Sequence, residues 1–262
     1  MAVTSARNPA AALVLAAAVA GLVAPAAVAQ DKGREKGSSP FRSLGDMLFP
    51  DKSDESRRAA PPVARYVSET GEVFTLDRST ARPMLRFEGS NEIWVLEPQP
   101  GARGDTLYKT DAGRVMLRDT KVGGLTIFTP RRREGAAAAL VGETNPIRLQ
   151  PVGPKALYQR LYESSTLVSR AARRQVPFEA EASPASSVLI ADAAMITADT
   201  LVRLSATPQG RERLSRIQRV FLTEGPRPSV TLHDGVLIVI VAPRLGLAGR
   251  PSSERVSFAT AP

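Results

Sequence analysis

The chain has 262 residues and a formal net charge of +9, with 35 Lys and Arg against 26 Asp and Glu. It has no Cys and one His, which excludes disulfides, thiolate nucleophiles and Cys-ligated metals and leaves a zinc hydrolase with a single histidine ligand. No phosphate-binding loop, dinucleotide fingerprint or nucleophile elbow occurs, so the sequence predicts no cofactor and no metal site.

Residues 1–29 have the pattern of a cleaved secretory signal. Arg7 precedes an apolar run from Ala10 to Val23, and Ala27-Val28-Ala29 forms a small-x-small cleavage site. The apolar run is shorter than the roughly 20 residues that a spanning helix needs. We therefore expect cleavage after Ala29 and export to the periplasm, with an uncleaved anchor as the alternative. The mature chain would keep 34 basic and 26 acidic residues, a net charge of +8.

Residues 30–64 are rich in charged residues, Ser and Pro, and are predicted to be largely disordered. One short stretch within them differs. Phe41, Leu44 and Leu48 recur at helical spacing after Ser39-Pro40, which resembles a helix start. This stretch is interpreted either as a docking helix for a membrane or partner, or as a helix that packs on its own domain.

Residues 65–130 alternate strand-sized apolar runs with turn signals. The turns are marked by Thr70-Gly71, Gly89-Ser90-Asn91, Asp111-Ala112-Gly113 and Gly123-Gly124, where Gly and Asn accept the positive φ of tight turns. This pattern predicts about six short antiparallel strands in a meander or small barrel. Three prolines between positions 146 and 154 then mark a passage to a helical half.

The segment 154–224 is predicted to hold three helices. The first begins at Pro154, the second runs from about Ser186 to Ala206, and the third begins at Thr207-Pro208 and ends at Gly225-Pro226. The second is nearly all apolar, which is typical of a central, buried helix. Its acid Asp199 lies one turn before Arg203, and these two are predicted to form a buried ion pair.

The segment 229–242 is predicted to form a hairpin with Asp234-Gly235 at its tip. The unbroken apolar run Val236–Val241 indicates a strand covered on both faces. We expect a single α+β domain over residues 65–242. An antiparallel β-meander and the C-terminal hairpin would form one sheet, with about three helices packed on it. Residues 243–262, rich in Gly, Pro and Ser, are expected to be a flexible tail.

Candidate chemistry is sparse. The one histidine, His233, falls at the predicted hairpin tip, where an exposed polar residue is expected rather than a catalytic one. A glycosidase would need two carboxyl groups at a fixed gap, and the acids near predicted turns are better explained as turn residues. Trp94 is interpreted as a core residue rather than a ligand platform. The acids near predicted turns that were weighed for a glycosidase are Glu88, Glu92, Asp105 and Asp111.

Arginines on the predicted helices form a candidate anion-binding surface, because Arg binds carboxylates and phosphates in a bidentate manner. Two plainer explanations stay open: a genome rich in G and C, and cations at helix C-termini that suit the helix dipole. The residues of this surface are Arg170, Arg173, Arg174, Arg213 and Arg216.

Several stretches together resemble a family of exported proteobacterial proteins that is described only as a domain of unknown function. They include the segments 73–79, 87–90, 103–108 and 123–130, and the likeness extends from about Arg65 to Ala242. The resemblance implies export and one family-wide domain, and it carries no catalytic residues.

The sequence thus favours a non-catalytic binding or interaction module of the envelope, whose arginine surface meets an anionic envelope component or an envelope protein. Nucleic acid is not an expected partner. Peripheral membrane contact through Phe41, Leu44 and Leu48 is a further expectation. The alternative is a carboxylate-dependent hydrolase that acts on an envelope polymer.

Overall fold

The computed structural model describes residues 60–261, which belong to one compact unit. The predicted signal segment 1–29 and the predicted helix around Phe41, Leu44 and Leu48 lie outside the described residues. Within residues 60–261, no helix combines the length and apolarity needed to cross a bilayer.

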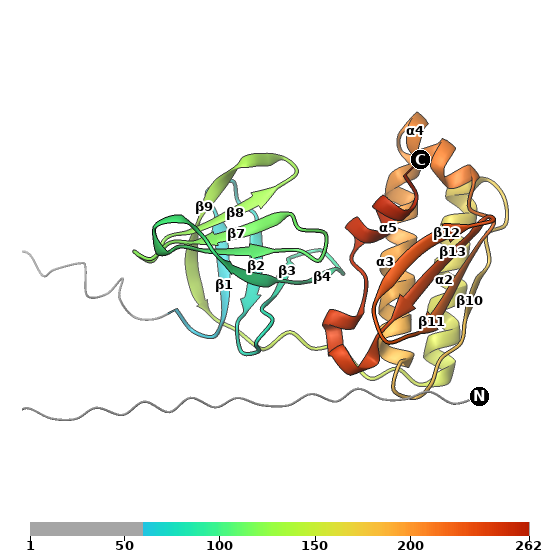
Figure 1. Cartoon of the computed structure of the whole chain (residues 1–262), viewed down its shortest axis with the longest axis horizontal. Helices are drawn as coiled ribbons and strands as arrows, with labels where there is room; N and C mark the ends of the chain where they lie inside the picture. Colours follow the sequence, from blue (N-terminus) through green and yellow to red (C-terminus); the bar gives the residue numbers. More distant parts are fainter. Residues whose placement is uncertain (1–59, 262) are drawn as a thin grey trace, which may run out of the picture. The chain divides into compact units, whose positions relative to one another are not determined.

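The N-terminal half is a nine-stranded antiparallel sheet that curls into a nearly closed barrel (Figure 1). The sheet order is β4-β3-β2-β1-β9-β8-β7-β6-β5, and Leu96 alone separates β4 from β5. One run of chain therefore pairs with β3 through its first part and with β6 through its second part, which brings the two sheet edges together. The strands are β1 (Val63–Ser68), β2 (Val73–Asp77), β3 (Met84–Phe87), β4 (Ile93–Val95), β5 (Glu97–Pro100), β6 (Thr106–Lys109), β7 (Val115–Asp119), β8 (Leu125–Thr129) and β9 (Arg132–Glu143).

Side chains fill the barrel interior, as expected for a barrel of this size. Alternate residues of each strand point inward, so that Phe74 and Leu76 of β2 and Leu125 and Ile127 of β8 are buried. The Phe74 ring stacks on the Tyr66 ring, with centroids 5.5 Å apart. The predicted antiparallel meander is thus confirmed.

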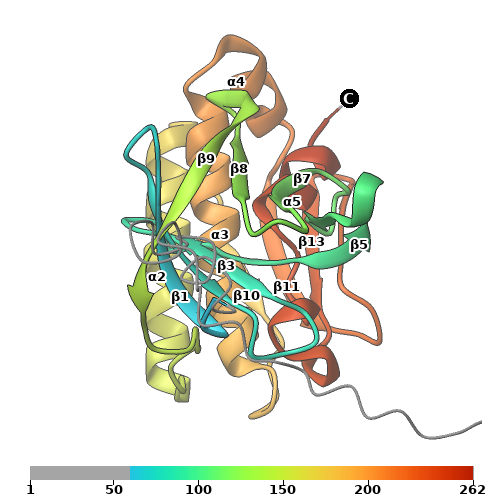
Figure 2. The ribbon, with the colours of Figure 1, turned by 90° about the vertical axis from the view of Figure 1, so that its left-hand side faces the viewer.

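The C-terminal half is a second, four-stranded sheet with helices against it. Its order is β10-β11-β13-β12, with the β10–β11 and β11–β13 pairs parallel and the β12–β13 pair antiparallel. Figures 1 and 2 show α2 and α3 side by side against one face of this sheet, and the two share its apolar core. The elements are α2 (Pro154–Ala172), β10 (Phe178–Ala180), α3 (Ser187–Ser205), α4 (Pro208–Ser215), β11 (Arg219–Glu224), β12 (Ser229–His233), β13 (Val236–Val241) and α5 (Ser253–Ala259).

Two predictions about this half were wrong. The hairpin forms as expected, but it joins β11 and not the barrel sheet. The predicted third helix stops at Ser215, because the run Val220-Phe221-Leu222 becomes a strand that pairs in parallel with β13. That pairing depends on tertiary contacts and has no local signal. The described part of the chain therefore holds two sheets and four α-helices rather than one sheet and about three.

The expected flexible tail from residue 243 is also wrong. Pro243–Gly249 forms a 3-10 segment (η2), and α5 follows with Val256 buried. The Ala242 N–H donates to the Gly249 carbonyl at 2.8 Å, an approach so close that a Cβ at Gly249 would lie 1.9 Å from the Ala242 oxygen. The C-terminal segment is thus part of the folded core.

Candidate functional site

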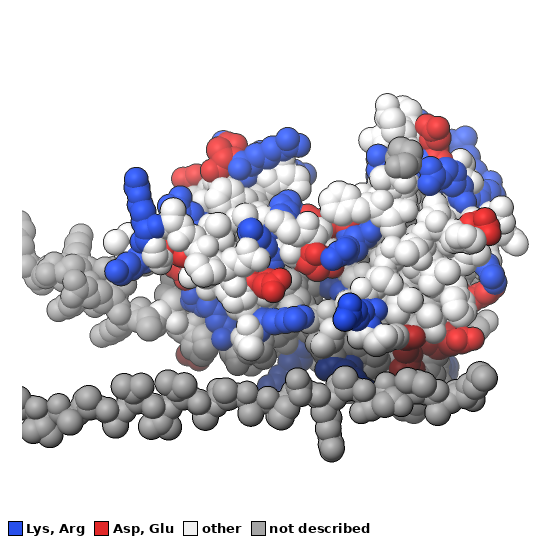
Figure 3. Space-filling view, viewed as in Figure 1, with Lys and Arg blue, Asp and Glu red and all other residues white. Residues whose placement is uncertain are grey.

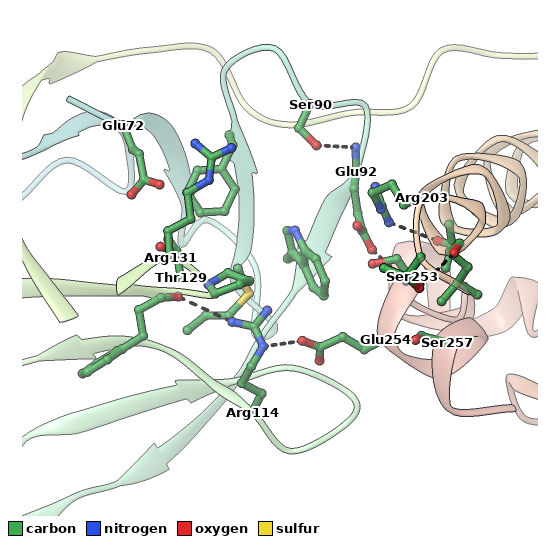
Figure 4. Close-up of a pocket in the computed structure, with 18 residues that line it drawn as sticks. Glu72, Ser90, Glu92, Arg114, Thr129, Arg131, Arg203, Ser253, Glu254 and Ser257 are labelled. Carbon is green, nitrogen blue, oxygen red and sulfur yellow. Dashed lines mark hydrogen bonds and ion pairs between the residues drawn. The ribbon is translucent and has the colours of Figure 1, made fainter. Parts of the chain in front are cut away.

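Four turns of the barrel meet at one of its ends, which we call the mouth. Because successive strands are antiparallel, the β1–β2, β3–β4, β6–β7 and β8–β9 turns all lie at this end. Helices α3 and α5 lie over it, and between them and the barrel is an open hollow of about 560 Å³, which we call the mouth pocket (Figure 4). The barrel contributes Glu72, Phe87, Ser90, Glu92, Trp94, Arg114, Met116, Phe128, Thr129, Pro130 and Arg131, and the helical half contributes Thr200, Arg203, Leu204, Thr207, Ser253, Glu254 and Ser257.

The barrel side of the mouth pocket is mostly apolar. Phe87, Trp94, Met116 and Phe128 form this wall. Trp94 packs partly against the barrel core, as predicted, and its half-buried ring also faces the pocket. The Arg114 guanidinium lies 5.4 Å from the centre of that ring, a cation–π distance. The interpretation of Trp94 as core alone was therefore incomplete.

An ion pair links the barrel to α5 along one side of the pocket. Arg114 Nε contacts Glu254 Oε1, and the Thr110 hydroxyl donates to Glu254 Oε2 at 2.7 Å. Figure 4 shows this pair spanning from the β6–β7 turn to α5. The contact fixes the start of α5 against the barrel mouth.

Glu92, in the β3–β4 turn, is 5% exposed and holds the same segment from the other side. The Ser253 N–H donates to Glu92 Oε1 at 2.8 Å. Burial raises the pKa of Glu92, although this hydrogen bond and the nearby Arg250 and Arg203 charges act in the opposite direction.

A buried ion pair anchors the C-terminal segment beneath the pocket. Arg250 Nε lies 2.6 Å from Asp192 Oδ2 on α3, with side chains 2% and 5% exposed. Arg250 also donates to the Ile93 carbonyl of β4, so one guanidinium joins α3, β4 and the chain leading to α5. Burial raises the pKa of Asp192 and the Arg250 charge opposes that shift. An apolar mutation of either partner alone would leave a buried, uncompensated charge.

Two arginines of the mouth pocket have no carboxylate within 4 Å among residues 60–261. Arg131, in the β8–β9 turn, and Arg203, near the end of α3, are both exposed. Arg203 donates to the Thr200 hydroxyl at 3.1 Å. Figure 4 shows Arg131 reaching in from the barrel side and Arg203 lying on the helical side. The pocket therefore combines an apolar wall with two cations available to a ligand.

The predicted Asp199–Arg203 ion pair does not form among the described residues. Arg203 is exposed and bonds Thr200, whereas the fully buried acid of α3 is Asp192. Its partner, Arg250, lies almost 60 residues away in sequence, where helical spacing cannot indicate a contact.

The four acids weighed for hydrolysis face different hollows of the surface. Glu92 lines the mouth pocket, Asp105 the outer surface of β6–β8, Asp111 a small cavity beside Arg250, and Glu88 a groove next to Arg65. Three of them have arginine partners: Glu88 pairs with Arg65, Asp105 with Arg118 and Asp111 with Arg255. No pair of the four is brought together across one cleft. His233 is exposed at the β12–β13 turn, where its ring contacts Asp234.

The predicted anion-binding residues do gather at one end of the helical half. The C-terminus of α2 lies beside the C-terminus of α4, because Arg174 donates to the carbonyls of Leu214, Ser215 and Ile217. Figure 3 shows Lys and Arg side chains next to α4. We call Arg170, Arg173, Arg174, Arg213 and Arg216 the arginine patch; within it Arg170, Arg173 and Arg216 are exposed, and Arg174 and Arg213 are half-buried.

Sequence reasoning missed the mouth pocket as a site. It named Glu92, Trp94 and Arg203 from the pocket but assigned all three to other roles. The contributing residues come from four turns, four strands, two helices and the N-cap of α4, and no spacing rule connects them. Within residues 60–261, no cluster of three His, Asp or Glu residues could hold a metal ion.

Comparison with known proteins identifies the family. The family model described as "Domain of unknown function (DUF4908)" matches residues 43–260, most of the chain. The chain therefore belongs to this family. No curated protein and no solved structure matches it.

Proposed function

Starting from membership of a family whose description assigns no activity, we propose that this protein is a non-catalytic binding module. Its mouth pocket would take a small amphiphile with an apolar body and an anionic group. The observation that carries the proposal is the combination, in one cavity of about 560 Å³, of an aromatic wall and two arginines without carboxylate partners in the described chain. Cavities of this size, largely apolar with a few polar groups, are typical of small-molecule sites, and barrel mouths are a common place for them.

The electrostatics of the pocket support an anionic ligand over a cationic one. Glu254 is already paired with Arg114, and the buried Glu92 carboxylate is engaged with the Ser253 N–H. Of the charged groups that line the pocket, Arg131, Arg203 and Glu72 then remain for a ligand, which leaves a positive balance. Because both arginines are exposed, salt screens part of their attraction for an anion, and the apolar wall beside them supplies the rest of the binding energy.

The predicted export fits this ligand class. A signal at residues 1–29 would deliver the chain to the periplasm, where membrane lipids and their fragments supply anionic amphiphiles. The mouth pocket would then be the main binding site for the predicted partner, an anionic envelope component. The arginine patch would contribute only a weaker attraction through screened surface charge.

The alternative, a carboxylate-dependent hydrolase, has one supporting observation. Glu92 lines a pocket and has a raised pKa, as a general acid often does. Its carboxylate, however, accepts the Ser253 N–H, and the other acids considered for this role line other hollows. Binding is the better-supported function.

The test is calorimetric titration of the mature protein with three ten-carbon amphiphiles: decanoate, decanol and decyltrimethylammonium. We expect decanoate to bind with one site per chain and a negative heat-capacity change. Decanol should bind more weakly and decyltrimethylammonium weakest. The absence of binding by all three, or tightest binding of the cation, would overturn the proposal.

A matched pair of variants locates the site. Ser257 of α5 lines the pocket, whereas its neighbour Phe258 is 64% exposed and does not. Ser257→Trp should occupy part of the cavity and weaken decanoate binding, and Phe258→Trp should leave it unchanged. Equal binding by both variants would place the ligand elsewhere.

A further inference from the structure

We propose that the ligand is a long-chain amphiphile, whose anionic end occupies the mouth pocket and whose chain continues into a second hollow on the outside of the barrel. This inference rests on the function proposed above and extends it to the length of the ligand. It is carried by the way the two hollows adjoin.

The second hollow, which we call the outer groove, has a volume of about 800 Å³ and lies over β6, β7 and β8. Strand alternation explains its apolar lining. Tyr108 and Ile127 are buried, so their neighbours Leu107 and Phe128 face the outside. Val115 adds to this lining. The groove thus offers a strip of apolar surface that begins beside the mouth.

The two hollows share a wall. Arg114, Phe128, Thr129, Pro130 and Glu254 line both of them. Part of this divider is the Arg114–Glu254 ion pair, whose side chains are 33% and 19% exposed (Figure 4). A divider made partly of flexible side chains can move aside by changing rotamers, whereas a backbone wall cannot. The apolar stem of Arg114 would also cover a chain that passes it.

Charge sets the orientation. The mouth pocket holds two arginines without carboxylate partners in the described chain, Arg131 and Arg203. In the outer groove, Arg118 is paired with Asp105 at 2.5 Å, so Arg133 is its one arginine without a carboxylate partner among residues 60–261. The anionic group therefore belongs in the mouth pocket and the chain in the groove.

The experiment measures displacement of the fluorescent anion 1-anilinonaphthalene-8-sulfonate by hexanoate, decanoate and tetradecanoate, each below its critical micelle concentration. Every buried methylene should strengthen binding about fourfold. We expect the gain in affinity to continue from decanoate to tetradecanoate in the wild-type protein. A plateau at the length that fills the mouth pocket would overturn the inference.

Variants separate the groove from the mouth. Val115→Glu places a charge in the outer groove, and Val122→Glu makes the same change at a turn residue that is 92% exposed. Val115→Glu should weaken tetradecanoate at least tenfold and leave hexanoate unchanged, while Val122→Glu should change neither. Leu107→Glu replaces Val115→Glu if that variant does not fold.

The outcomes distinguish this inference from the function on which it rests. One outcome is that hexanoate and decanoate bind, but tetradecanoate binds no more tightly than decanoate and its affinity is unchanged by Val115→Glu. The ligand's chain then does not enter the groove, and only the inference fails. If none of the three displaces the fluorescent anion, the proposed function fails as well.

Discussion

Arginines gather in two places in the described part of this chain, and their surroundings differ. In the mouth pocket, Arg131 and Arg203 border a cavity walled by aromatic side chains. In the arginine patch, Arg170, Arg173 and Arg216 are exposed on the open ends of α2 and α4. By number of charges the arginine patch would be the better anion-binding site. By its apolar surroundings the mouth pocket is the better one.

The comparison teaches that concavity, more than charge, indicates a specific site. Exposed charges at a helix end interact weakly and are screened by salt within about 10 Å. Part of the patch is also engaged within the fold, since Arg174 donates to three carbonyls at the end of α4. Arg174 thus stabilises the packing of α2 on α4, and the apolar wall makes the pocket the better place for an amphiphilic ligand.

The largest predicted effect comes from breaking the buried Asp192–Arg250 ion pair, which fixes the C-terminal segment that borders the mouth pocket. Arg250→Ala would leave Asp192 buried without a partner and should cost about 3–5 kcal/mol of unfolding free energy. Urea denaturation measures the loss, and binding of decanoate should weaken with it. The double change Asp192→Leu with Arg250→Met removes both charges and should restore most of the stability. A loss below about 1 kcal/mol in Arg250→Ala would contradict the anchor.

A smaller effect is expected within the arginine patch. Arg174→Ala removes the donor for the carbonyls of Leu214, Ser215 and Ile217 and should cost about 1–2 kcal/mol in thermal or urea unfolding. Arg216→Ala, an exposed neighbour, should stay within about 0.5 kcal/mol of the wild type. Equal losses for the two variants would show that Arg174 has no structural role.

The smallest predicted effect concerns pH. Because burial raises the pKa of Glu92, the folded state binds this proton more tightly than the unfolded state. The stability that this tighter proton binding adds to the folded state is fully present below the ordinary Glu pKa. It is lost as the pH rises through the raised pKa of Glu92. Glu92→Gln stays neutral, so its stability relative to the wild type should increase across this window, by at most about 1.4 kcal/mol for each pH unit. Denaturation of both proteins from pH 4 to pH 8 checks this, and parallel curves would refute it.

The barrel could be predicted because its signals are local. Gly71, Gly89, Gly113 and Gly123 all have positive φ in the structure, so the turns they mark in the sequence are real. Apolar alternation between them then fixes which face of each strand is buried. The closure of the barrel could not be predicted, since it depends on a change of pairing partner at Leu96, from β3 to β6, that no turn residue indicates.

The second sheet and the site could not be predicted for a different reason. The parallel pairing of β11 with β13 joins segments through tertiary contacts, and the charged residues before Val220 favoured a longer helix. Likewise, Arg250 reaches Asp192, and Ser253 reaches Glu92, across 58 and 161 positions of sequence. A Gly-, Pro- and Ser-rich composition suggested a tail where buried partners in fact fix the chain.

One measurement tests the central claim, that the mouth pocket and not the arginine patch binds an anionic amphiphile. Decanoate affinity is determined for two double variants, Arg131→Gln with Arg203→Gln in the pocket and Arg173→Gln with Arg216→Gln in the patch, at low and high salt. Both variants lose the same charge. We predict at least tenfold weaker binding for the pocket variant at both salt concentrations and no change for the patch variant. Equal weakening of both, or weakening confined to the patch variant and to low salt, would contradict the claim.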